Sequence, residues 1–165
     1  MSISKYIRLI MLLKSLTMTS LTSSAGEPAK VNFKCNIHTI NKQEGQPKTP
    51  IDDKFGGYVI IYKSHHPNDH VGRMGLLIIR DCHSLDDENP NYWAYDIECP
   101  SCKAKNIRSE IYMKTNIVAE CPKCRADWQN IHMGAAGQTN RVGKYWLTMY
   151  KTELKGDMLY ITNWF

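Results

Sequence analysis

Hydrophobic and polar residues alternate with a period of two along much of the chain beyond its N-terminal segment. Residues 31–38 place Val31, Phe33, Cys35 and Ile37 on one face and polar side chains on the other. This is the pattern of a half-buried β-strand. Runs rich in β-branched and aromatic residues, which favour strands, recur further along. We predict further strands at 57–62, 75–80, 92–98, 109–113, 116–120, 145–151 and 158–162.

Polar segments with turn-forming residues separate these predicted strands. Residues 41–55 form a polar loop with two prolines, and Asn-Pro-Asn at 89–91 is a turn signal. The last two strands are joined by residues 152–157, a hairpin connection with a late glycine. No amphipathic pattern with a helical period extends beyond two turns after the N-terminal segment. Many short strands with turns between them predict an all-β fold, a small antiparallel β-sandwich or barrel.

The first 25 residues differ in composition from the rest of the chain. They contain three basic residues and no acidic residue, an apolar run at 9–13, and small residues at positions 23 and 25. This order is typical of a signal peptide, so we predict a signal peptide at 1–25 and a single exported β-domain at 26–165, in the periplasm or cell envelope. An amphipathic N-terminal segment or a misassigned start codon is the alternative. No apolar run reaches the ~18 residues of a membrane span, so none is expected.

Much of the net positive charge of the chain comes from this N-terminal segment. The 165 residues include 21 Lys and Arg against 16 Asp and Glu, a formal charge of +5. Three of the basic residues fall within 1–25, which leaves 18 basic against 16 acidic residues, or +2. No block of like charge remains, because glutamates interleave with the loose basic stretch at 103–114. We therefore expect no nucleic-acid partner.

Four of the six cysteines stand in two closely spaced pairs. Cys99, Cys102, Cys121 and Cys124 form the pattern C-x2-C-x18-C-x2-C, which is the spacing of a four-Cys zinc site. Two ligands separated by two residues fit one tight turn, and the two strands predicted between the pairs can return the second turn beside the first. The pattern favours a metal site, with two disulfides or free thiols as the alternatives, and it says little about which metal is bound.

The remaining cysteines and two of the histidines give weaker signals. Cys35 falls on the apolar face of a predicted strand and is most simply a core residue. A Cys35–Cys82 disulfide is the alternative, because the number of cysteines is even and export is predicted. His83 and His132 are isolated along the sequence, so we interpret each of them as structural or exposed.

Other polar clusters do not form a recognisable catalytic arrangement. The polar loop at 64–74 carries His65, His66 and His70, and we interpret it as a solvated hairpin tip in preference to a metal site. The acidic turn at 86–88 lacks the regular oxygen-ligand spacing of a Ca²⁺ loop. No Ser/His/Asp order that a β scaffold would assemble is evident. An independently acting enzyme is therefore the least favoured class.

The cysteine segments resemble the cluster-binding half of Rieske proteins. The resemblance is carried by YWAYDIECPSC at 92–102, by CPKC at 121–124, and by GKYWLTMYKTELKGDMLYITN at 143–163, which looks like the final hairpin of that family. It implies a Rieske-like fold with two cysteine-bearing loops at one tip of a metal-binding subdomain, at about 93–143. It also implies a small exported protein of a Gram-negative bacterium.

The ligands differ from those of the family. A Rieske centre holds a [2Fe–2S] cluster with two Cys and two His. By the resemblance, Cys99 and Cys121 match the Cys ligands, whereas Cys102 and Cys124 stand where the family has His, which excludes a true Rieske centre. A single tetrahedral ion and a four-Cys [2Fe–2S] cluster stay open, with mononuclear iron as a third option.

Two similar cysteine turns suit one tetrahedral ion, and redox-silent Zn²⁺ tolerates an oxidising compartment. We therefore predict a structural Zn²⁺ in a binding or structural module. The alternative is a [2Fe–2S] electron-transfer protein that uses the same four cysteines. The partner would be an unidentified protein in the first case and a redox partner in the second.

Overall fold

The computed structural model describes residues 29–40, 57–63, 66–83, 90–139 and 145–164. The signal peptide predicted at 1–25 and the acidic turn at 86–88 lie outside these residues. No helix in the described part of the chain is long and apolar enough to cross a membrane. The elements are β1 Val31–Asn36, β2 Tyr58–Ile61, β3 His70–Val71, β4 Leu76–Arg80, β5 Tyr92–Asp96, α2 Pro100–Lys103, β6 Tyr112–Thr115, β7 Val118–Glu120, β8 Asp127–Gln129, η2 Ile131–Met133, β9 Met149–Lys155 and β10 Met158–Thr162.

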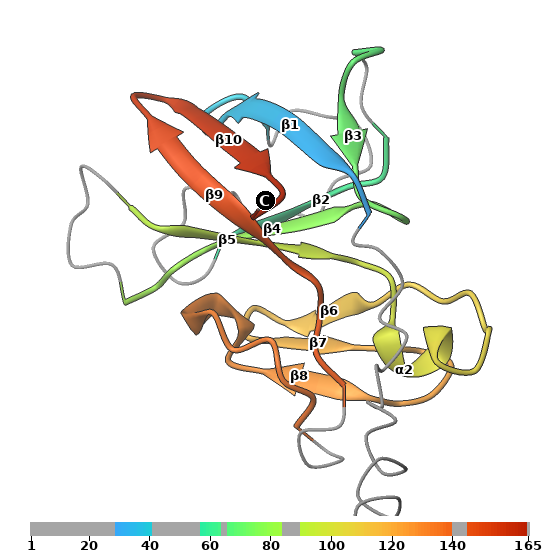
Figure 1. The fold of residues 1–165 in the computed structure, drawn as a ribbon. Helices are drawn as coiled ribbons and strands as arrows, with labels where there is room; N and C mark the ends of the chain where they lie inside the picture. Colours follow the sequence, from blue (N-terminus) through green and yellow to red (C-terminus); the bar gives the residue numbers. More distant parts are fainter. Residues whose placement is uncertain (1–28, 41–56, 64–65, 84–89, 140–144, 165) are drawn as a thin grey trace, which may run out of the picture.

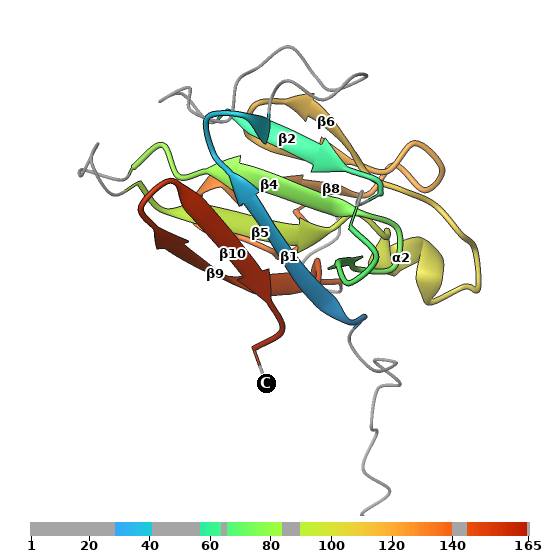
Figure 2. The same cartoon turned by 90° about the horizontal axis from the view of Figure 1, so that it is seen from above.

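Seven strands form one sheet that curls into a nearly closed barrel (Figure 1 and Figure 2). Their order is β2-β4-β5-β9-β10-β1-β3, and each pairing is antiparallel. Strand β9 joins the two halves, because Met149 and Tyr150 pair with β5 while residues 151–155 pair with β10. The prediction of an all-β, antiparallel, barrel-like fold is confirmed.

A second, three-stranded sheet of order β6-β7-β8 lies against the barrel. Figure 1 shows this sheet below the barrel, with α2 at one of its ends and the coil of η2 at the other. We call β6, β7, β8, α2 and η2 together the small layer.

Strand β4 is buried on both faces, which explains why its Leu-Leu-Ile-Ile sequence shows no alternation. Leu76 and Ile78 point into the barrel core, where they meet residues of β1, β2, β5, β9 and β10. Leu77 and Ile79 belong to a second core that includes Trp128 of β8. The outer face of β4 and its neighbours is thus the platform on which the small layer packs.

Most predicted strands are present, but several segments differ from the prediction. Strands β3 and β8 were not predicted, and β9 begins only at Met149. The strand expected at 109–113 begins later, because the backbone of Ser109 and Ile111 pairs with the segment leading into the first cysteine pair. The expected connection at 152–157 is wrong, since β9 continues to Lys155 and pairs there with Met158. Only Gly156-Asp157 forms the turn, and Gly156 takes the left-handed φ of 56° that suits glycine.

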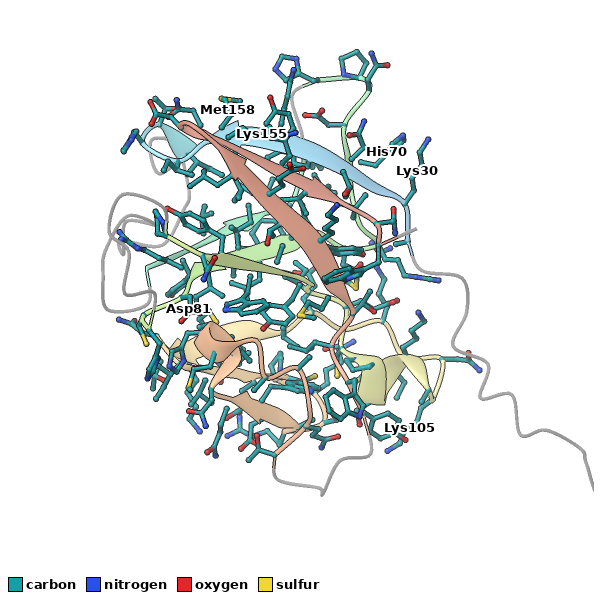
Figure 3. The ribbon with its side chains drawn as sticks, turned by 60° about the vertical axis from the view of Figure 1, so that its left-hand side comes forward. Lys30, His70, Asp81, Lys105, Lys155 and Met158 are labelled. Atoms are coloured by element: carbon teal, nitrogen blue, oxygen red, sulfur yellow. The ribbon has the colours of Figure 1, made fainter. Side chains whose placement is uncertain are left out.

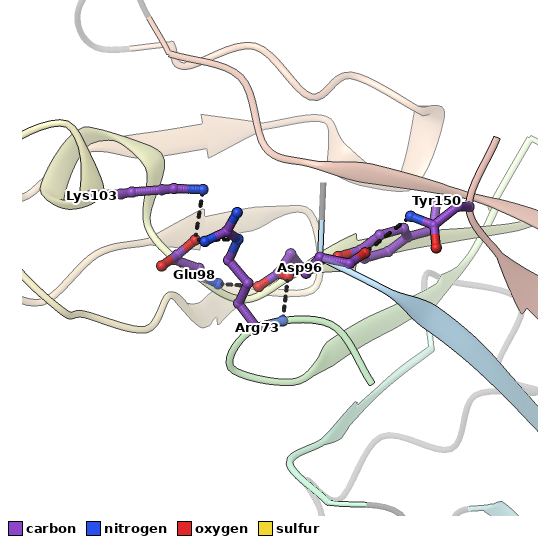
Figure 4. Close-up of polar contacts among 7 residues, drawn as sticks. Arg73, Asp96, Glu98, Lys103 and Tyr150 are labelled. Carbon is purple, nitrogen blue, oxygen red and sulfur yellow. Dashed lines mark hydrogen bonds and ion pairs between the residues drawn. The ribbon is translucent and has the colours of Figure 1, made fainter. Parts of the chain in front are cut away.

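A buried carboxylate connects the barrel to the small layer (Figure 4). Asp96, at the end of β5, is 2% exposed. Its Oδ2 accepts hydrogen bonds from the Tyr150 hydroxyl and the Arg73 amide, and its Oδ1 accepts one from the Glu98 amide, each at 2.8 Å. The Glu98 carboxylate in turn pairs with Lys103 Nζ at 3.1 Å and with Arg73 Nε at 3.6 Å. This network fixes the chain where it leaves the barrel for the first cysteine pair.

The Tyr150→Phe substitution tests this network. It keeps the ring in the barrel core and removes one donor to a buried carboxylate, so we expect a loss of about 1.5–3 kcal/mol in the free energy of unfolding, measured by urea denaturation. Tyr160→Phe is the matched control, because Tyr160 is 37% exposed and should change stability little. Equal effects of the two substitutions would contradict this role of Asp96.

Candidate metal centre

The first cysteine pair lies on a single helical turn. Cys99 caps α2 (Pro100–Lys103), and Pro100 stands at the start of the helix, where its fixed φ and missing N–H are tolerated. The Cys102 amide donates to Cys99 Sγ at 3.4 Å, and the Lys103 amide donates to the Cys99 carbonyl at 2.9 Å. Both thiols therefore face the same side of the turn. The sequence pattern did not predict this helix, because one turn is too short to show a helical period.

The second pair follows β7 and forms a similar turn. The Arg125 amide donates to the Cys121 carbonyl at 3.0 Å, as the Lys103 amide does to Cys99, and the Cys121 amide donates to the Ala126 carbonyl at 2.8 Å. Arg125 takes a left-handed φ of 59°. We call these two cysteine turns the knuckles.

The hairpin of β6 and β7 brings the two knuckles together. Glu98 and Glu110 form an antiparallel bridge, and the Cys99 amide donates to the Ser109 carbonyl at 2.8 Å. The chain then runs out along β6 and returns along β7 to Cys121. The predicted excursion between the two pairs is thus present.

The four sulfur atoms meet between the knuckles. Cys99 Sγ and Cys124 Sγ lie 3.6 Å apart, as do Cys102 Sγ and Cys121 Sγ, and all four lie within 4.8 Å of one another. A tetrahedral ion with four metal–sulfur bonds of about 2.3 Å separates its sulfurs by about 3.8 Å. A disulfide would need about 2.05 Å between two sulfurs. The four cysteines could therefore bind a metal ion.

The site is largely buried, with only Cys124 partly exposed, so placing several negative charges in it is unfavourable. Cys99, Cys102 and Cys121 are each at most 1% exposed. Burial and the neighbouring sulfurs raise the pKa of the Cys99 and Cys102 thiols. Burial also raises the pKa of Cys121, but the Ser109 hydroxyl and the amides of its own knuckle outweigh that effect and lower the pKa. A cation would offset the charge of several thiolates in this space.

An ion pair closes each knuckle at its ends. Glu98 precedes Cys99 and pairs with Lys103 at 3.1 Å, while Glu120 precedes Cys121 and pairs with Arg125 at 2.8 Å. The segments read ECPSCK and ECPKCR, so the acidic and basic flanks repeat together with the cysteines. Sequence reasoning identified the cysteines but missed this six-residue repeat. The repeat could have predicted the two ion pairs that flank the cysteines.

The two other cysteines lie away from the knuckles as free thiols. Cys35 is on β1 and packs against the barrel core, where burial raises its pKa to about 12. Cys82 follows β4, in a turn, and is half-buried. The Cys35–Cys82 disulfide stays a prediction.

The histidines considered in the sequence analysis lie in different surroundings. His65 lies outside the described residues, and neither His66 nor His70 belongs to a group of metal-ligand side chains there. His83 and His132 are not isolated in space, because their rings stack with centroids 5.8 Å apart. They are isolated along the sequence, but packing brings them together from distant segments. His83 is exposed and His132 is buried, which agrees with the interpretation of each as structural or exposed.

No protein-family model matches the chain, and no curated protein or solved structure matches it either. The resemblance to Rieske proteins therefore stays a prediction. The structure does show two general features that the resemblance implies, an all-β, barrel-like fold and four cysteines gathered in one place.

Ser109→Ala tests how the knuckle environment tunes the cysteines. The Ser109 hydroxyl lies 3.3 Å from Cys121 Sγ, and groups that hydrogen-bond to metal ligands typically contribute about 10–100-fold in affinity. We expect a loss of about tenfold in Zn²⁺ affinity, measured by competition with a chelator. Thr152→Val, which removes a hydroxyl bonded to the Tyr92 carbonyl in the barrel, is the control. An unchanged affinity in Ser109→Ala would exclude this role.

Proposed function

We propose that the protein is an exported, Rieske-like metal-binding protein in which Cys99, Cys102, Cys121 and Cys124 hold one structural Zn²⁺. The observation that carries the proposal is the mutual approach of the four sulfurs to within 4.8 Å. The ion would fasten the two knuckles to each other, and the small layer would act as a binding or structural module.

The separation of the sulfurs favours one ion over a [2Fe–2S] cluster. A cluster divides its four cysteines between two iron atoms, so sulfurs on different irons stand farther apart than sulfurs on the same iron. In this chain each short 3.6 Å contact joins one knuckle to the other, and no sulfur pair exceeds 4.8 Å. This compact group matches the single tetrahedron that Zn²⁺ prefers.

The ligand set supports a structural role in preference to a catalytic one. Four cysteines complete the coordination of Zn²⁺, whereas catalytic zinc sites keep a position open for water. Zinc binding would contribute folding energy directly, because the knuckles are not assembled in the unfolded chain. Cys99, Cys102 and Cys121 are also part of the second core, together with Trp128 and Leu77. Fastening the knuckles would therefore stabilise the packing of the small layer on the barrel.

Export of the protein rests on the basic, then apolar, then small-residue order of residues 1–25. A colourless zinc centre suits that location, since Zn²⁺ has no redox chemistry for an oxidising compartment to disturb. Mature protein with residues 1–25 still attached would contradict this part of the proposal, and N-terminal sequencing of the secreted fraction checks it.

Metal analysis of Cys99→Ser tests the proposal. We expect the unsubstituted protein to retain zinc without visible absorption after dialysis against a weak chelator, and Cys99→Ser to lose it. Hydrogen exchange should accelerate at 99–124 in the variant, while β1 and β10 stay protected, because the knuckles lose their fastening.

Cys35→Ser is the matched control, since Cys35 lies on β1 away from the knuckles, and it should keep its zinc. Visible absorption bands with two irons per chain would support the [2Fe–2S] electron-transfer protein instead. A chain without metal and with the four cysteines in disulfides would overturn both functions.

A further inference from the structure

A second group of ligand side chains lies at the other end of the small sheet from α2. Cys82 and His83 follow the end of β4, and His132 lies on η2. The short helix η2 packs on the barrel, where the Tyr95 hydroxyl donates to the Ile131 carbonyl at 2.7 Å. Figure 3 shows Asp81, which precedes Cys82, beside the coil of η2. The packing of η2 thus brings two distant parts of the sequence together.

The three side chains converge closely enough to share one ion. Cys82 Sγ lies 3.0 Å from His83 Nδ1, and one ligand atom of each of the three residues lies within 4.8 Å of the others. A zinc ion with bonds of about 2.3 Å to sulfur and about 2.0–2.1 Å to nitrogen sets its ligand atoms about 3.3–3.6 Å apart. The upper bound of 4.8 Å on the distances among the three ligand atoms includes that spacing.

His132 carries an independent sign of a missing ligand. Its side chain is 4% exposed, and its Nδ1 is buried without a hydrogen-bond partner among the described residues. Buried polar atoms are nearly always paired, so an unpaired ring nitrogen needs an explanation. A metal ion bound at Nδ1 would supply one.

The turn that carries Cys82 and His83 is held in place by Asp81. Its Oδ1 accepts a hydrogen bond from the His83 amide at 2.8 Å, and its own amide donates to the Asn91 carbonyl at 2.9 Å. The carboxylate also places a negative charge next to the three ligands. A divalent cation bound to one thiolate and two neutral imidazoles keeps a net positive charge, which Asp81 would offset.

We propose that Cys82, His83 and His132 form a second metal site, which binds a divalent transition ion such as Zn²⁺. One thiolate and two imidazoles are a donor set that zinc takes in proteins, and three protein ligands leave a fourth position for water. The exposed His83 places that position at the protein surface. This site would therefore exchange its metal more readily than the closed four-cysteine site.

Titration of the full chain with Co²⁺ tests the proposal, because Co²⁺ reports thiolate and imidazole ligands by its visible and near-ultraviolet bands. We expect the protein to bind Co²⁺ with a sulfur-to-metal charge-transfer band while the metal already present in the four-cysteine site stays bound. Cys82→Ser should lose the charge-transfer band, and His83→Ala should weaken binding. His132→Ala should also weaken binding, but His132 is buried and its substitution could disturb folding. His83→Ala is therefore the preferred variant, because His83 is exposed.

Cys35→Ser and His70→Ala are the matched controls, since both residues lie outside the group, and each should bind Co²⁺ as the unsubstituted chain does. Binding that survives unchanged in both Cys82→Ser and His83→Ala would overturn the proposal. So would the absence of Co²⁺ binding, or a Cys35–Cys82 disulfide found by counting thiols in the denatured, unreduced protein. The titration uses protein whose four-cysteine site is first filled with Zn²⁺, as verified by metal analysis, so that Co²⁺ bound at those cysteines does not contribute to the band.

Discussion

Four sulfur atoms within 4.8 Å of one another, three of them in side chains at most 1% exposed, are the constraint on which the small layer depends. Several thiolates cannot share such a volume without a compensating charge. The Ser109 hydroxyl and the knuckle amides favour the thiolate of Cys121, but they face too few of the sulfurs to balance the whole group. A cation between the knuckles would satisfy the constraint, and an ion pair joins the two ends of each knuckle.

The barrel supplies the support for this arrangement. Strand β4 has one face in the barrel core and one in the core shared with the small layer, so the two layers cannot separate without exposing Leu77 and Ile79. Burial of one such side chain contributes about 1.5–3 kcal/mol. The Asp96 network adds polar contacts at the point where the chain enters the first knuckle. Metal binding at the knuckles would thus be coupled to the packing of the whole small layer.

The sequence was most informative where local spacing determines the structure. Alternation in β1 and the C-x2-C pairs predicted the barrel strands and the four-cysteine group, because both depend on neighbours in the chain. The repeat ECPSCK/ECPKCR was also present as a local signal for the flanking ion pairs. The meeting of Cys82 and His83 with His132 left no such signal, since it depends on how η2 packs against the barrel. The end of β9 was also missed, because residues 152–155 are mostly polar and were interpreted as part of a turn.

X-ray absorption spectroscopy at the metal edge tests the central claim most directly. The Cys82→Ser variant isolates the four-cysteine centre, because the second group is then incomplete. A single metal in this centre predicts one shell of four sulfurs at about 2.3 Å and no metal neighbour. Fewer than four sulfurs in that shell, or scattering from a second metal atom, would contradict the account.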